Sequence, residues 1–203
     1  MSDAQRLEPV ALDGKIVRLE PMTPEHHGAL TEIGNDPDLW RFTVSAPLSA
    51  ADMSEYMEVG LRAARDGTGV PFVTIEKASG RVIGSTRFAN YDAFNHRIEI
   101  GWTWIAKPWQ RTAVNTEAKY LMMSHAFEQL GCVRVELKTD VRNQQSRNAM
   151  LRIGAREEGV LRKHMLRSNG TYRDSIYYSV LDDEWPEVKA RLEAFMKRKN
   201  PRE

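Results

Sequence analysis

The chain has 203 residues, of which 41% are hydrophobic and 28% are charged. This size fits one domain with a substantial core, and this balance is typical of a globular protein rather than a disordered one. Its 29 basic residues nearly cancel 28 acidic residues, for a net charge of +1. Nucleic-acid-binding proteins usually carry a larger basic surplus. We therefore expect a single domain over residues 1–203 and no nucleic acid as a partner.

Other features of the composition exclude further classes. Cys132 is the sole cysteine, so an intramolecular disulfide and a cysteine-based zinc site are both excluded. We interpret it as a small core residue rather than a catalytic thiol. No stretch approaches the roughly 20 apolar residues needed to span a bilayer, and the N-terminus lacks a signal-peptide pattern. We expect a cytoplasmic protein without a membrane partner.

In chain order, the first half predicts a strand, two capped helices and a hairpin. Thr23 and Pro24 are typical of the start of one helix, and Ser49 is the expected N-cap of the next. The segment between these helices is expected to be a loop with a helical turn. The predicted strands and helices of this half cover residues 16–19, 24–34, 50–66, 70–76 and a strand that begins at 81.

Residues 97–105 predict the next strand. Its alternation places Glu99, Gly101 and Thr103 on one face and the large apolar residues, including Trp102 and Trp104, on the other. A helix over 116–130, a strand over 133–138, a helix over 144–153, strands at 156–166 and 171–181 and a closing helix are expected to follow. Hairpins and strand–helix–strand crossovers together predict a mixed sheet. Residues 1–13 and 197–203 are the expected flexible ends.

The segment from Trp104 to Glu117 combines a strand end, a loop and a helix start. Backbone N–H groups at a helix start have no intrahelical acceptors, and the helix dipole favours an anion there. This geometry predicts a phosphate site, to which Arg111 adds a full positive charge. The alternative is an ordinary helix start, capped by Asn115 or Thr116.

A second motif, Asn143-Gln144-Gln145-Ser146, follows one strand later. Together with Gln110 at the start of the preceding loop, with Gly154-Ala155 and with Glu158-Gly159, it resembles the GNAT superfamily of acetyltransferases. The resemblance is to the branch that acetylates the N-termini of ribosomal proteins, and it extends from about Lys15 to Leu181. It implies an α/β (α+β) fold, with a mixed, mostly antiparallel sheet of about seven strands flanked by helices.

The chain departs from this family at two places. Ala113 and Asn115 occupy positions where the loop usually has glycine, so we expect a different backbone path around a phosphate. Asn115 tolerates the left-handed conformation better than most residues do. Many relatives also carry a tyrosine that protonates the leaving thiolate, and this chain has Met150 at that position. Ser146, or a water that it holds, would have to take this role.

The resemblance implies acetyl-CoA as co-substrate, no metal, and two central strands that splay apart to expose backbone N–H groups. Asn143 would contact pantetheine, and Arg147 would contact a CoA phosphate, unless it is simply a solvated surface residue. The residues expected to bind the cofactor are Trp104, Ile105, Gln110, Arg111, Thr112, Ala113, Val114, Asn115, Thr116, Asn143, Ser146 and Arg147.

Glu99 is the candidate base for the acceptor amine, with a surface carboxylate in a salt bridge as the alternative interpretation. Ser146 is the candidate acid, unless it only caps backbone. His164 is a second candidate proton acceptor. Trp40 and Phe42 are expected in the acceptor pocket, with packing beneath their loop as the alternative. His26 and His27 lack a third ligand at metal spacing.

These features favour an N-acetyltransferase that moves the acetyl group of acetyl-CoA to a primary amine by direct attack in a ternary complex. The acceptor is expected to be a peptide N-terminus or a small molecule, and the protein a monomer or homodimer. A non-catalytic acyl-CoA-binding or regulatory domain of the same fold is the rival hypothesis, because the loop glycines and the tyrosine are absent.

Overall fold

The computed structural model describes residues 6–197, which form one eight-stranded sheet and five α-helices. The strands are β1 (Leu12–Asp13), β2 (Val17–Pro21), β3 (Val70–Glu76), β4 (Arg81–Asp92), β5 (Arg97–Ile105), β6 (Arg134–Asp140), β7 (Arg156–Leu166) and β8 (Tyr172–Leu181). The α-helices are α1 (His27–Gly34), α2 (Ala50–Arg65), α3 (Val114–Ser124), α4 (Gln144–Ile153) and α5 (Trp185–Lys197). Short helical turns are η1 (Pro24–His26), η2 (Pro37–Trp40), η3 (Lys107–Trp109) and the π-helical η4 (His125–Gln129).

The strand order in the sheet is β1-β2-β3-β4-β5-β6-β8-β7. Only β5 and β6 pair in parallel, and every other neighbouring pair is antiparallel. The predicted mixed, mostly antiparallel sheet is therefore confirmed. It has one strand more than the seven expected, because residues 12 and 13 pair with β2. None of the helices within residues 6–197 has the length and hydrophobicity of a bilayer-spanning segment.

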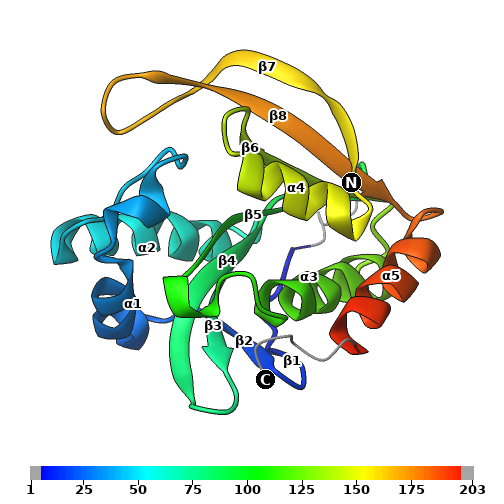
Figure 1. Ribbon diagram of the computed structural model, residues 1–203, viewed down its shortest axis with the longest axis horizontal. Coiled ribbons are helices and arrows are strands. Elements are labelled where there is room, and N and C mark those ends of the chain that lie inside the picture. Colours follow the sequence, from blue (N-terminus) through cyan, green and yellow to red (C-terminus); the bar gives the residue numbers. More distant parts are fainter. Residues whose placement is uncertain (1–5, 198–203) are drawn as a thin grey trace.

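Helices cover the two faces of the sheet unequally (Figure 1). One face packs against α3, α4 and α5, in a large apolar cluster that includes Ile98 and Ile100 of β5. The other face packs against α1 and α2, in a smaller cluster around Trp40, Met53 and Trp104. The second layer covers β3 and β4, so no helix of residues 6–197 covers the β6–β8 half of that face.

Local signals at the helix ends are partly confirmed. Ser49 accepts a hydrogen bond from Asp52 N–H in a capping box at the start of α2, and Gly154 ends α4 in the left-handed conformation. The start of α3 was predicted wrongly, because the helix begins at Val114 instead of residue 116. Neither Asn115 nor Thr116 caps it, since both lie within its first turn.

The predicted alternation of β5 was also wrong beyond Gly101. Trp102 has a φ of 54°, and the β4–β5 register shifts there, which marks a β-bulge. The added residue switches the faces of the strand beyond the bulge. Trp102 and Trp104 therefore pack against the α1–α2 layer, on the face opposite to Ile98 and Ile100. Thr103 instead points toward α3, where its hydroxyl accepts from Lys119.

The N-terminal segment packs more closely than expected over its described part. Leu7 is buried in the main core, and Leu12 contributes to the same cluster. Glu117 of α3 holds the turn before β2, because its carboxylate accepts from the backbone N–H groups of residues 15–17 at 2.7 to 2.9 Å. Of the expected flexible ends, residues 1–5 and 198–203 lie outside the described part of the chain.

Candidate active site

The centre of the sheet opens between its two parallel strands. The β5–β6 ladder is limited to the pairs from Arg97–Arg134 to Glu99–Glu136, although β5 continues to Ile105 and β6 to Asp140. Beyond Glu99 the facing edges of both strands therefore lack a strand partner in the described part of the chain. This opening agrees with the expected splay and leaves backbone donors and acceptors available to a ligand.

Glu99 lies at the closed end of this opening and is 2% exposed. Its Oε2 accepts from Asn90 Nδ2 at 2.8 Å and from Lys138 Nζ at 2.7 Å. Its Oε1 points toward Gly101, where a Cβ would lie only 2.8 Å away. The glycine therefore makes room for an oxygen that has no hydrogen-bond donor within residues 6–197. The alternative interpretation of Glu99 as a surface carboxylate is wrong, because the side chain is buried. The salt bridge of that interpretation is present, with Lys138 as the partner.

Further polar side chains continue from Lys138 along the uncovered half of the sheet. Lys138 Nζ lies 5.6 Å from the ring centre of Tyr177, and the Tyr177 hydroxyl lies 3.5 Å from His164 Nε2. His164 Nδ1 is buried and unpartnered among the described residues. Burial, followed by the charges of Lys138 and Arg173, lowers the pKa of His164. This imidazole is therefore neutral at neutral pH and close to Glu99.

The loop from Gln110 to Ala113 is a concentrated set of backbone donors. No acceptor within the described residues binds the N–H groups of residues 111, 112, 113, 115 and 116. Thr112 fixes the loop, because its hydroxyl donates to Trp109 O at 2.7 Å and accepts from Val114 N–H at 3.3 Å. Such a set of free donors at the start of an 11-residue helix suits a phosphate.

The left-handed residue of this loop is at neither of the two positions where the family usually has glycine. Arg111 has a φ of 61°, whereas Ala113 has a φ of −72° and Asn115 lies inside α3. The left-handed residue is thus Arg111, so neither of the expected glycine positions needs a glycine. Asn115 Oδ1 is buried without a donor among the described residues, and the Thr116 hydroxyl accepts from Arg152 at 2.7 Å.

Gln110 connects the two sides of the opening. Its Nε2 donates to Ile105 O at the end of β5 at 2.8 Å. Its Oε1 lies 3.5 Å from Gln145 Nε2 on α4. Trp104 is nearly buried, and its Nε1 donates to the Tyr56 hydroxyl at 3.0 Å. Gln110 and Trp104 therefore hold the end of β5 through side-chain contacts.

The start of α4 forms the opposite side. Asn143 caps this helix, with Oδ1 accepting from Ser146 N–H at 3.1 Å, so its Nδ2 is the group left for a ligand. The half-buried Ser146 hydroxyl has no hydrogen-bond partner within residues 6–197. Arg147 is partly exposed, and its guanidinium binds the Tyr178 hydroxyl, Val141 O and Glu157. Met150 is buried in the main core.

The two aromatic residues expected in the acceptor pocket are placed differently. Trp40 is 5% exposed, its Nε1 donates to Gly34 O, and its ring lies 5.0 Å from that of Trp104. Trp40 thus packs beneath its loop, which is the alternative given for it in the sequence analysis. Phe42 is half-buried and lines a surface cavity of about 510 Å³ between its loop, the end of β6 and the β7–β8 turn.

Three polar residues near Glu99 were missed by the sequence analysis: Asn90, Lys138 and Tyr177. Lys138 lies in the predicted strand over 133–138, but only the parallel pairing of Glu99 with Glu136 brings it across the opening. Asn90 has a φ of 51°, in a β4 segment whose register shifts. An asparagine in a long strand is the one local signal that could have indicated this irregularity.

Comparisons with known proteins agree with this geometry. Residues 17–156 match the acetyltransferase (GNAT) domain family. "Putative ribosomal N-acetyltransferase YdaF" of Bacillus subtilis is 39% identical over 106 residues, which cover 52% of this chain and 57% of that protein. The chain therefore matches little more than half the length of this curated relative.

Solved structures extend the likeness over nearly the whole chain. A GCN5-related N-acetyltransferase from Brucella melitensis has 30% identity and a TM-score of 0.86, with 98% of this chain and 89% of that chain covered. Mycobacterium smegmatis RimJ in complex with CoA-disulfide has a TM-score of 0.76, with 94% of each chain covered. At 21% identity, the latter likeness concerns the fold.

Proposed function

This chain belongs to the GNAT acetyltransferase family, and from this premise we propose that it transfers the acetyl group of acetyl-CoA to a primary amine. The observation that carries the proposal is the opening between β5 and β6, with a buried carboxylate at its closed end. Beside it lie the N–H groups of residues 111–113, 115 and 116, which have no acceptor among the described residues. A binding domain without catalysis has no need for the carboxylate.

The residues present fit acetyl-CoA. The loop from Arg111 to Thr116 offers free N–H groups for the pyrophosphate, and Arg111 adds a guanidinium that forms no ion pair in the described part of the chain. Asn143 Nδ2 and the unpaired edge of β5 near Trp104 and Ile105 would bind the pantetheine amides. When bound, acetyl-CoA supplies a thioester whose carbonyl carbon an amine can attack.

Three groups would then act on the reacting atoms. Backbone N–H groups on the free edge of β5 would stabilise negative charge on the carbonyl oxygen. Glu99 Oε1 would accept the proton that the amine loses, directly or through one water. Ser146, whose hydroxyl has no hydrogen-bond partner among the described residues, would protonate the departing thiolate, directly or through water. The neutral imidazole of His164 is the second candidate for the amine proton.

In this scheme the acetyl group moves in one step within a ternary complex. The amine nitrogen forms its bond to the carbonyl carbon as the carbon–sulfur bond breaks, and the sulfur receives a proton. The scheme includes no covalent enzyme intermediate. Cys132 is a poor nucleophile for one, because it is buried and burial raises the pKa of its thiol to about 11. We propose a peptide N-terminus or a small amine as the acceptor.

A direct test measures free thiol released from acetyl-CoA while amines are offered, alongside calorimetry of acetyl-CoA binding. We expect binding and amine-dependent release, and we expect Glu99→Gln to bind acetyl-CoA normally but to lose at least about 100-fold in rate, as for other general bases. Glu55→Gln is the matched control, because Glu55 is exposed on α2.

The outcomes separate the two hypotheses. Binding without release for peptides, polyamines and aminoglycosides would favour the non-catalytic acyl-CoA-binding domain. Absence of binding at millimolar acetyl-CoA would refute both. An unchanged pH–rate profile in Glu99→Gln would move the base role to His164, which a His164→Gln variant would then test.

A further inference from the structure

The cavity beside Phe42 is unusually rich in arginine. Arg41 and Phe42 line it from the segment between η2 and α2, Arg142 from the segment after β6, and Arg167 from the β7–β8 turn. The turn and the first segment are in direct contact, because Ser168 N–H donates to Val44 O at 2.9 Å. Figure 1 shows the β7–β8 hairpin reaching over this segment.

The positive charge of the cavity is only partly compensated. Asp140 is buried and forms ion pairs with both Arg142 and Arg167. Arg41 forms no ion pair within residues 6–197, and its guanidinium lies 5.2 Å from the centre of the Phe42 ring. Three guanidinium groups thus face one carboxylate, which leaves two positive charges without a counter-charge among the side chains that the structure describes.

Arg167 is the strongest indication that the cavity is built for an anion. It is 7% exposed, and its Nη1 donates to the carbonyl oxygens of Arg41 and Thr43, each at 3.3 Å. Its Nε has no acceptor among the described residues. Buried donors normally find a partner, since leaving one unpaired is unfavourable. Arg173 is buried as well, and burial, followed by the positive charge of Arg167, lowers the pKa of Arg173.

The cavity lies at the open end of the gap between β5 and β6. Arg142 follows β6 by two residues, and Arg41 follows Trp40, whose ring contacts Trp104 near the end of β5. The η2–α2 segment belongs to the α1–α2 side of the sheet, whereas the free N–H groups at the start of α3 belong to the opposite side. A ligand in the cavity and a phosphate at α3 would therefore approach the opening from different faces.

We propose that this cavity recognises a negatively charged group of the acceptor, so that the preferred substrate is an amine that carries a carboxylate or phosphate nearby. This inference rests on the proposed acetyl transfer. Arg41 and Arg142 would bind the anion from the solvent side, and Arg167 Nε would supply a donor from below. Guanidinium groups bind carboxylates and phosphates through charge-assisted hydrogen bonds, which are the stronger class.

The test compares acceptors that differ only in charge. The peptides Ser-Glu-Asp-Ala-amide and Ser-Gln-Asn-Ala-amide form one pair, and free glutamate with its diamide forms the other. O-phosphoethanolamine with ethanolamine adds a phosphate. We expect kcat/KM from thiol release to be at least about tenfold higher for an anionic member, as expected for hydrogen bonds to a charged group. The preference should weaken at high salt.

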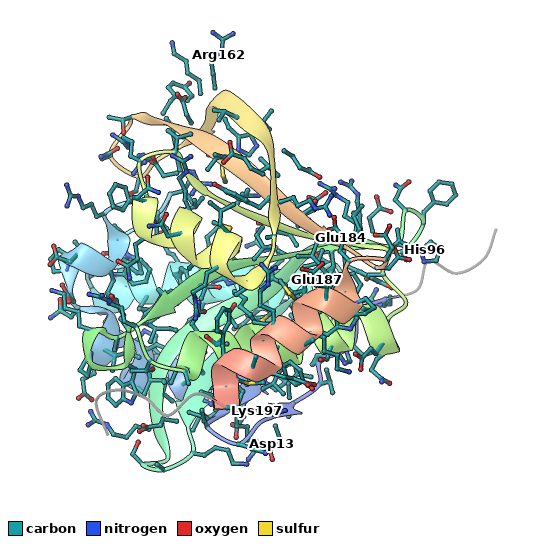
Figure 2. All side chains as sticks on the ribbon, turned by 45° about the vertical axis from the view of Figure 1, so that its right-hand side comes forward. Asp13, His96, Arg162, Glu184, Glu187 and Lys197 are labelled. Atoms are coloured by element: carbon teal, nitrogen blue, oxygen red, sulfur yellow. The ribbon has the colours of Figure 1, made fainter. Side chains whose placement is uncertain are left out.

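Arg41→Gln is the central variant, because this side chain is exposed and its loss breaks no ion pair. It should reduce the preference for the anionic acceptor to about a third or less, with acetyl-CoA affinity unchanged. Arg162→Gln is the matched control. It also removes one positive charge, but from strand β7, where Figure 2 shows Arg162 extending away from the molecule.

Each failure has a separate meaning. If no acceptor releases thiol, the proposed function fails. If neutral acceptors release thiol as fast as anionic ones, acetyl transfer stands and the anionic acceptor is refuted. If Arg41→Gln weakens acetyl-CoA binding, the cavity belongs to the co-substrate, which also overturns the inference. The pair with the larger preference identifies a peptide carboxylate, a free amino acid or a phosphate as the source of the charge.

Discussion

Replacing Lys119 by methionine tests a cation buried beneath the bulge of β5. Lys119 is 6% exposed, and its Nζ donates to Thr103 Oγ1 at 2.9 Å. Thr103 Oγ1 in turn lies 2.8 Å from Thr86 Oγ1, so the ammonium group has a hydroxyl rather than a carboxylate for a partner. Burial lowers the pKa of Lys119 from its ordinary 10.5 to about 7, and no neighbouring charge contributes.

The cost of this burial depends on pH. Below pH 7, Lys119 is protonated in the folded and unfolded chains, and the folded state bears the full desolvation cost. This is about 5 kcal/mol at about 1.4 kcal/mol per pH unit. Between pH 7 and 10.5 only the unfolded chain holds the proton, so the cost falls as the pH rises and the fold becomes more stable. Above pH 10.5 the cost is absent.

Methionine has a similar length and no charge, so Lys119→Met removes this cost and loses one hydrogen bond, worth about 1 kcal/mol. We expect the variant to be about 3–4 kcal/mol more stable at pH 6. The difference should fall by about 1.4 kcal/mol per pH unit above pH 7 and vanish near pH 10. Urea unfolding followed by tryptophan fluorescence at pH 6 to 10 measures it.

The control is Lys15→Met, which removes an exposed lysine. The difference in the free energy of unfolding between this variant and the unmodified chain should be nearly independent of pH. A Lys119→Met variant that is less stable at pH 6, or whose stability difference stays constant from pH 6 to 10, would refute the reasoning. Either result would mean that Lys119 is solvated or paired in the folded protein.

Three further substitutions test contacts around Glu99 and at the start of the sheet. Lys138→Met leaves the buried Glu99 carboxylate without its ion-pair partner, so urea unfolding should show a loss of about 3 kcal/mol, which adding Glu99→Gln should partly restore. Gly101→Ala places a methyl group 2.8 Å from Glu99 Oε1, so kcat should fall at least about tenfold with acetyl-CoA affinity unchanged; an equal loss of affinity would contradict this. Glu117→Gln weakens three charge-assisted bonds from residues 15–17, and an unchanged unfolding midpoint would disprove the expected loss of about 2 kcal/mol.

The site was predictable from the sequence where it depends on local structure. The predicted helix over 144–153 is α4, with Asn143 as its N-cap and Gly154 at its end, because a cap needs only its own helix end to act. The loop after β5 was recognised as a donor-rich helix start, although its left-handed residue proved to be Arg111. Most side chains tolerate several backbone conformations. The sequence of a loop therefore does not reveal which of its residues adopts the left-handed conformation.

Periodicity, capping residues and turn chemistry in the sequence thus determined the order and type of most elements, and the motif from Asn143 to Ser146 together with Gln110 indicated the family by resemblance. The tertiary structure decided which side chains meet across distant elements. The bulge at Trp102 reverses the faces of β5, and the pairing of Glu99 with Glu136 brings Lys138 to the carboxylate. The meeting of Arg41 with Arg167 depends on the contact between two loops 126 residues apart. Such pairings follow from sheet register and loop packing, which local sequence does not encode.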